Sequence, residues 1–190
     1  MLSSITPLGQ RSKGMSWGRT VIGFWIGAIA AGTAVFSLLG VIGELFALDR
    51  VAPWVSLLVV GLAAVLDWAG VKPPGPRRQV NEDWLGRYRD WVIGFGFGAQ
   101  LGVGFVTIIP SFGTWALYLV ATASGLPLAA ALGAAFGLGR SLLLITTRVI
   151  WSPSALATVM QRFTGAERKA RWVALAGYAL VLIVVGVDVV

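Results

Sequence analysis

Residues 91–123, WVIGFGFGAQLGVGFVTIIPSFGTWALYLVATA, form one apolar stretch that contains no charged residue. A membrane-spanning α-helix needs about 20 apolar residues, and at ~1.5 Å per residue a straight helix of this length reaches roughly 50 Å, against a hydrocarbon core of ~30 Å. Pro110 removes a backbone donor and clashes with the preceding turn, while Gly113 permits dihedrals that other residues avoid. The sequence therefore predicts an interrupted helix, with Ile108 to Thr114 outside continuous α-helix.

The rest of the chain repeats the apolar character in shorter stretches. These run at about 20–48, 53–71, 126–150 and 172–187. A chain that is 57% hydrophobic and 12% charged lies far from the soluble average. We expect an all-α polytopic membrane bundle in which a basic cytoplasmic segment, 1–19, precedes one transmembrane domain, 20–190. The first stretch exceeds the ~7 to 15 residues of a signal-peptide core, so it is expected to remain as a span.

Basic residues decide between two topologies. Residues 91–123 are either one interrupted span, giving five spans, or a tight hairpin at Pro110, giving six. Lys and Arg cluster before the first stretch, between the second and third (Lys72, Arg77, Arg78, Arg87, Arg89), and between the fourth and fifth (Arg162, Arg168, Lys169, Arg171). The positive-inside rule places these clusters together in the cytoplasm, which only five spans allow. We predict a multi-pass protein of a bacterial inner membrane, N-terminus in and C-terminus out.

Several kinds of chemistry are excluded by composition. The chain has neither cysteine nor histidine, which removes disulfides, thiolate or imidazole metal sites and histidine general bases. We expect no metal and no cofactor. The net charge of +7 falls between the apolar stretches, as expected for headgroup contact rather than nucleic-acid binding.

The predicted break is the first candidate site. Irregular backbone inside a membrane is tolerated only where it is buried in protein or lines a cavity. Thr107, Ser111 and Thr114 supply hydroxyl groups beside Pro110 and Gly113. Two interpretations stay open: an ordinary proline kink, and a substrate or ion site at a discontinuous helix.

Arg140 is the deepest charged residue of the predicted spans. Asp67 and Gln100 come to a similar depth, so both are expected as its partners. The interaction is either an ion pair that fixes helix register or part of a site for an anionic substrate or headgroup. Arg148 lies nearer the cytoplasmic interface and is expected to snorkel, and Glu44 is expected at the outer interface.

Small residues recur at four-residue spacing, which places them on one helix face. They are Gly23, Gly27, Ala31, Gly94, Gly98, Gly102, Gly133 and Gly137. Such faces favour close helix packing within the bundle or a homodimer seam. Trp84, Tyr88 and Trp91 share the face of a short helix expected on the cytoplasmic membrane surface, or alternatively against a partner protein. A second basic amphipathic stretch surrounds Met160 to Phe163, after a helix start at Ser152-Pro153-Ser154.

The glycine-rich sequence from Gly94 to Gly113, followed by Leu132-Gly-Ala-Ala-Phe-Gly-Leu-Gly139, resembles the transmembrane domain of the DsbD/CcdA thiol-disulfide transporters. In that family a glycine-rich helix carries a Pro-Cys break, and the next helix ends in a Gly-Leu-Gly-type turn. Ser111 stands where the family has its cysteine, and the family's first helix, with the other redox cysteine, has no counterpart here. The resemblance implies the fold and not the reaction, because a thiol-disulfide relay needs a thiol pair.

These observations favour a non-enzymatic membrane subunit or scaffold that acts with another membrane protein or a second copy. A small-solute transporter or channel, with its site at Pro110 to Thr114 and Arg140 within reach, is the second hypothesis. An enzyme is third, because only hydroxyls and a few carboxylates are left as candidate catalysts.

Overall fold

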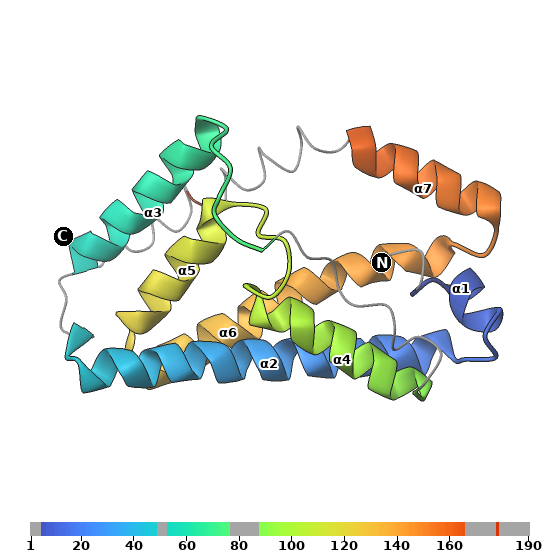
Figure 1. The fold of residues 1–190 in the computed structure, drawn as a ribbon, viewed down its shortest axis with the longest axis horizontal. Coiled ribbons are helices and arrows are strands. Elements are labelled where there is room, and N and C mark those ends of the chain that lie inside the picture. Colours follow the sequence, from blue (N-terminus) through green and yellow to red (C-terminus); the bar gives the residue numbers. More distant parts are fainter. Residues whose placement is uncertain (1–4, 49–52, 77–87, 166–177, 179–190) are drawn as a thin grey trace.

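A computed structural model describes residues 5–48, 53–76, 88–165 and 178, and within this part of the chain every regular element is helical (Figure 1). The elements are α1 (Pro7–Arg11), α2 (Trp17–Leu45), α3 (Pro53–Trp68), α4 (Asp90–Val103), α5 (Phe112–Thr122), α6 (Gly125–Leu142), the 3₁₀-helix η3 (Leu143–Val149) and α7 (Pro153–Gly165). The all-α prediction is confirmed for these residues.

Helix α2 is the long axis of the bundle, against which α4 and α6 pack most extensively and α5 less, whereas α3 packs on α5 (Figure 1). Gly23 of α2 lies against the Trp91 backbone and Gly27 against Phe95, so α4 runs in the same direction as α2. Farther along α2, Phe36 stacks on Tyr118 of α5, and Gly43 meets the Thr122 backbone. Both α4 and α5 therefore follow α2 in one direction.

Helix α6 returns along α2. Gly40 of α2 lies against the Gly125 backbone, Gly32 against Gly133, and Ala28 against Gly137, so the order reverses. The small residues predicted to share faces thus bring helix backbones into direct contact, because a Cβ built on Gly94, Gly98 or Gly102 would overlap α2 backbone atoms. The small-residue spacing predicts either close packing within the bundle or a homodimer seam. The structure shows the close packing within the bundle.

Within the described part of the chain, two helical segments are long and apolar enough to cross a membrane: Trp17–Leu45 and Gly125–Val149. Helices α3 and α5 are apolar but shorter. Large apolar side chains remain exposed along the bundle, among them Ile22, Leu38 and Leu45 on α2 and Leu58 and Leu62 on α3. An apolar surface of this extent is expected of a chain that faces lipid or another protein.

The predicted boundaries shift at several places. The first predicted span, 20–48, is a helix from Trp17 to Leu45. The predicted span 126–150 is α-helical only to Leu142 and continues as a 3₁₀-helix. The predicted span 172–187, apart from Tyr178, lies outside the described residues, as do residues 77–87 of the predicted surface helix.

The N-terminal segment is packed against the bundle from Ile5 onward. The Ile5 side chain is buried, and its carbonyl accepts a hydrogen bond of 3.2 Å from the Thr147 hydroxyl. The Leu8 amide donates to the Ile150 carbonyl at 3.1 Å, and the Thr20 hydroxyl donates to the buried Gln10 side chain at 2.9 Å. Sequence patterning did not predict helix α1 or this docking.

Helix α7 begins where Ser152-Pro153-Ser154 predicts a helix start. Pro153 is its first residue, and the Ser152 hydroxyl accepts a hydrogen bond of 3.2 Å from the Ala155 amide. This is the N-cap geometry that serine favours, with proline at the first helical position, where no amide donor is needed.

Candidate functional site at the helix interruption

Helix α4 ends at Val103 with Gly104 as its C-cap, and residues 104–111 separate it from α5, which begins at Phe112. Gly104 has a φ of +81°, a left-handed conformation that residues with a Cβ seldom adopt. A side chain at this position would also overlap the Tyr118 hydroxyl and the Phe136 ring. Glycine is therefore favoured at position 104 for two reasons: the left-handed backbone conformation and the lack of space for a side chain.

The carbonyl of Val103, freed at the end of α4, has two hydrogen-bond donors. The Tyr118 hydroxyl donates a hydrogen bond of 2.7 Å to the carbonyl of Val103, and the Phe105 amide reaches the same carbonyl at 3.0 Å. Tyr118 belongs to α5, so the second half of the interrupted segment closes the end of the first half. Its ring packs among Phe36, Trp115 and Phe136.

Asp67 of α3 caps the start of α5. Ser111 stands at the N-cap position, but its side chain makes no capping hydrogen bond. Instead, the Phe112 amide donates to Asp67 Oδ1 at 2.9 Å. The Tyr178 hydroxyl donates to Asp67 Oδ2 at 2.6 Å and also contacts the Ser111 side chain. A carboxylate at a helix N-terminus interacts favourably with the unpaired amides and with the helix dipole.

The structure brings only some of the predicted site residues together. Ser111 and Gly113 lie beside Tyr178, and a Cβ on Gly113 would overlap the Tyr178 hydroxyl. Thr107 and Thr114 are buried, and the Thr107 hydroxyl makes a long hydrogen bond of 3.5 Å to the Gly104 carbonyl. Pro110 is exposed.

The predicted pairing of Arg140 with Asp67 and Gln100 is wrong for the described part of the chain. There, Arg140 is not hydrogen-bonded to either expected partner, and Asp67 instead accepts from the Phe112 amide. The Arg140 guanidinium lies 5.4 Å from the centre of the Phe136 ring. Its Nη1 is buried and has no hydrogen-bond partner among the described residues. The aromatic face supplies the attraction that the prediction assigned to a carboxylate.

All three acidic residues of the described part accept hydrogen bonds from backbone amides at helix starts. Besides Asp67, Glu44 Oε1 accepts from the Leu126 amide at 2.6 Å, at the start of α6. Asp90 Oδ2 accepts from the Ser16 amide at 3.2 Å, just before α2, and Asp90 Oδ1 from the Trp91 amide at 2.9 Å in α4. Glu44 is exposed near the link between α5 and α6. The positions of all three acidic side chains are explained by these hydrogen bonds without a bound ligand.

Asp90 also forms the ion pair with Arg19, whose Nε lies 2.9 Å from Asp90 Oδ2. Burial alone raises the pKa of a carboxyl group. The amides of Ser16 and Trp91, together with Arg19, outweigh the burial and lower the pKa of Asp90 below its ordinary value. Asp90 is therefore held as a carboxylate that joins the starts of α2 and α4.

Together, these features describe a helical protein with long apolar candidate spans and acidic side chains used for capping. Among the described residues, no group of three or more acidic side chains is placed to hold a metal ion.

The chain is similar to the methylamine utilization protein MauF of Paracoccus versutus. The two are 35% identical over 156 residues, which cover 74% of this chain and 54% of the relative, so the chain spans about half the length of the curated relative that it matches. No protein-family model and no solved structure matches the chain. The resemblance to the DsbD/CcdA transporters stays a prediction.

Proposed function

We propose that the chain is a non-enzymatic accessory protein of the membrane that acts with another protein in methylamine utilization. The observation that carries this proposal is the similarity to MauF, whose name assigns it to methylamine utilization. The use of the described acids as helix caps also supports it, because it leaves few groups for catalysis.

Helix α3 offers a surface for such a partner. Its exposed large side chains, spaced three or four residues apart, form one stripe: Trp54, Leu58, Leu62, Val65 and Trp68. Residues at this spacing share a helix face. Two tryptophans at the ends of an apolar stripe are typical both of interfacial anchors and of protein contacts.

Deletion in a methylamine-using bacterium that carries the chain tests the role. The deletion strain should not grow on methylamine but should still grow on a multicarbon substrate. Expression of the wild-type chain should restore growth on methylamine. Detergent pull-down from the restored strain should recover a partner in fixed proportion. Replacement of Leu58 and Leu62 by alanine should weaken that recovery, and replacement of Ile22 and Leu38, exposed on α2, should not. Unimpaired growth of the deletion strain on methylamine would reject the proposal.

Five spans with the N-terminus in the cytoplasm complete the proposal. Support comes from α4 and α5, which follow α2 in the same direction rather than turning back at Pro110. Engineered cysteines at Gly75 and Gly165 should be protected from impermeant thiol reagents in intact cells, and one at Ser124 should be labelled. Labelling at Gly165 from outside would remove the five-span topology.

A small-solute transporter remains a second candidate because of one observation: Arg140 Nη1 is buried without a hydrogen-bond partner among the described residues, on a helix that borders the interruption. A buried cation of this kind suits an anionic solute. Ser111→Trp should then block uptake and leave the thermal unfolding of the detergent-solubilised protein unchanged. If the Ser111→Trp strain still grows on methylamine, the result would support the accessory role and not the transporter.

The DsbD/CcdA resemblance enters the proposal only as a fold. It is supported by a glycine-rich helix, α4, that packs closely on α2 and is followed by an interrupted segment. An experimental structure of the chain, superposed on members of that family, tests it. Different helix connectivity would reject the relationship and leave the accessory role untouched.

A further inference from the structure

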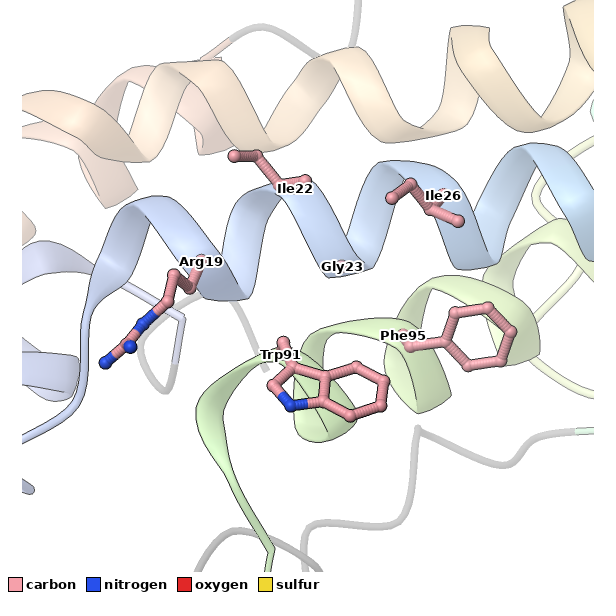
Figure 2. A pocket seen from close by; sticks show the side chains of 6 residues that line it. All are labelled: Arg19, Ile22, Gly23, Ile26, Trp91 and Phe95. Carbon is pink, nitrogen blue, oxygen red and sulfur yellow. The ribbon is translucent and has the colours of Figure 1, made fainter.

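A groove of about 380 Å³ runs along the outside of the contact between α2 and α4, lined by Arg19, Ile22, Gly23, Ile26, Trp91 and Phe95 (Figure 2). Its volume falls within the ~300 to 1,000 Å³ of known ligand pockets. Gly23 forms part of the floor, where the two helices touch through backbone atoms. Figure 2 shows Arg19 and Trp91 toward one end of the groove and Ile26 and Phe95 toward the other.

The lining divides into a charged end and an apolar body. Ile22 and Ile26 are more than half exposed, at 59% and 56%, because no described residue covers them. At the other end, Trp91 provides an indole ring that is itself 53% exposed. Tryptophan is enriched at the level of lipid headgroups. The groove therefore changes from interfacial to apolar along its length.

Arg19 presents its charge at the interfacial end. Its Nε is held by Asp90, whereas the side chain as a whole is 69% exposed. Its two Nη groups make no hydrogen bond with any described residue. The ion pair thus fixes the guanidinium in place and leaves a pair of donors for an oxygen ligand, a geometry that suits phosphate.

Other positive charges gather at the same end of the bundle. Arg89 adjoins Asp90 in sequence and is exposed, and Arg11 and Lys13 precede the start of α2. Asp90 is the acidic residue of this end among the described residues, and it already accepts hydrogen bonds from Ser16, Trp91 and Arg19. The excess of positive charge complements the anionic lipids of a cytoplasmic leaflet.

We propose that this groove is a binding site for one anionic phospholipid, with the headgroup phosphate on the Arg19 Nη groups beside Trp91 and an acyl chain along Ile22, Ile26 and Phe95. The proposal rests on the proposed membrane placement, with the start of α2 on the cytoplasmic side. A lipid in this position would cover the line along which α2 and α4 meet.

Native mass spectrometry of the full chain, purified in detergent and supplied with phosphatidylglycerol or phosphatidylcholine, tests the site. The wild type should retain phosphatidylglycerol in preference to phosphatidylcholine. Arg19→Gln, whose amide can still donate to Asp90, should weaken the retention of phosphatidylglycerol about fivefold, the factor that ~1 kcal/mol between one basic residue and anionic lipid produces. Retention of phosphatidylcholine should stay unchanged.

A matched control removes the same charge elsewhere at this end of the bundle. Arg148 is exposed in the last turn of η3 and does not line the groove, so Arg148→Gln should retain phosphatidylglycerol as the wild type does. An equal loss in Arg19→Gln and Arg148→Gln would mean diffuse charge attraction and would overturn the site. The absence of any loss in Arg19→Gln would overturn it as well.

A second pair of variants leaves the ion pair intact. Ile26→Trp should fill the apolar part of the groove and lower the retention of both lipids, whereas Leu38→Trp, equally exposed on α2 outside the groove, should not. Equal retention in these two variants would reject the acyl-chain position. Alkaline extraction of membranes separates the two levels of the proposal: a chain that is released was never embedded, and a chain that is retained without lipid preference refutes the groove alone.

Discussion

The two halves of the interrupted segment pack on α2 by different means. Helix α4 meets α2 through glycines, and a Cβ on Gly94, Gly98 or Gly102 would overlap backbone atoms of α2. Helix α5 meets α2 mainly through large rings: Tyr118 lies 5.2 Å from Phe36, measured between ring centres, and backbone approaches backbone at the end of α5, where Gly43 meets Thr122. The first contact is backbone on backbone at three glycines, and the second is mainly side chain on side chain, with one backbone approach at Gly43.

This difference indicates how much each contact can adjust. Backbone in direct contact has no rotamers through which to relax, so an added side chain must move a whole helix. Aromatic rings in contact can shift, and the loss of one polar atom leaves the rest of their packing in place. We therefore expect α4 to be fixed on α2 and α5 to depend on a few side-chain interactions.

The largest effect is expected from Gly98→Val, because its Cβ would overlap the Phe24 carbonyl. The cost should reach or exceed the ~3 kcal/mol at the upper end of ordinary overpacking and should prevent recovery of folded protein from detergent. Gly139→Val is the matched control, since no atom lies within 4 Å of a Cβ on Gly139. Equal thermal unfolding of the two variants would show that α4 and α2 are not in backbone contact.

The sequence predicts this half of the fold well for a local reason. The spacing of Gly94, Gly98 and Gly102 marks a face through helix geometry alone, and that face is the one that packs. The length of residues 91–123 and the position of Pro110 predict non-helical backbone from Ile108 to Thr114. In the structure, α4 ends earlier, at Val103, before the left-handed Gly104, and α5 begins at Phe112, so the prediction is wrong for Phe112 to Thr114.

Asp67→Ala should have the next largest effect, and it acts on the α5 half. The substitution removes the acceptor of the Phe112 amide and of the Tyr178 hydroxyl. The loss of a capping side chain costs about 1 to 2 kcal/mol. Asp67→Asn keeps one oxygen acceptor and should cost less. The free energy of unfolding in detergent with added denaturant measures both, and equal values for alanine and asparagine would contradict the capping role.

The role of Asp67 lay outside the reach of sequence patterns. The hydrogen bond from Phe112 to Asp67 spans 45 residues, that from Leu126 to Glu44 spans 82, and that from Ser16 to Asp90 spans 74. Capping rules apply to residues that adjoin the helix start, where the Ser111 side chain makes no capping hydrogen bond. Similar depth along the spans suggests that Asp67 pairs with Arg140. That prediction is wrong because depth does not show which side chains are neighbours, and the neighbour of Arg140 is the Phe136 ring.

Tyr118→Phe should have a smaller effect, since it keeps the ring and removes only the hydroxyl that donates to the Val103 carbonyl. The loss of this one hydrogen bond costs about 1 kcal/mol, and the Phe105 amide still donates to the same carbonyl. The variant should therefore loosen the end of α4 and leave the aromatic cluster intact. Hydrogen exchange at Gly104 to Thr107 should increase, whereas exchange in the α4 residues that face Gly23 and Gly27 should not. Tyr88→Phe, at an exposed position, serves as the control.

The smallest effect concerns the acidic residue that joins the starts of α2 and α4. The pKa of Asp90 is lowered in the folded protein because the Ser16 and Trp91 amides and Arg19 outweigh its burial. A lowered pKa means that the carboxylate stabilises the fold fully above the unfolded value of ~3.9, and that this contribution is lost as the pH falls through the folded pKa. Thermal unfolding of the wild type in detergent should therefore shift to lower temperature below about pH 4, and Asp90→Asn should shift less, since it no longer titrates.

The shift for Arg19→Gln should lie between those of the wild type and Asp90→Asn, because this variant removes one of the three groups that lower the pKa of Asp90 and leaves both amides. If Asp90→Asn follows the wild-type curve between pH 6 and pH 3, the junction of α2 and α4 depends on the glycine contacts alone, and the charged end adds only lipid or partner recognition.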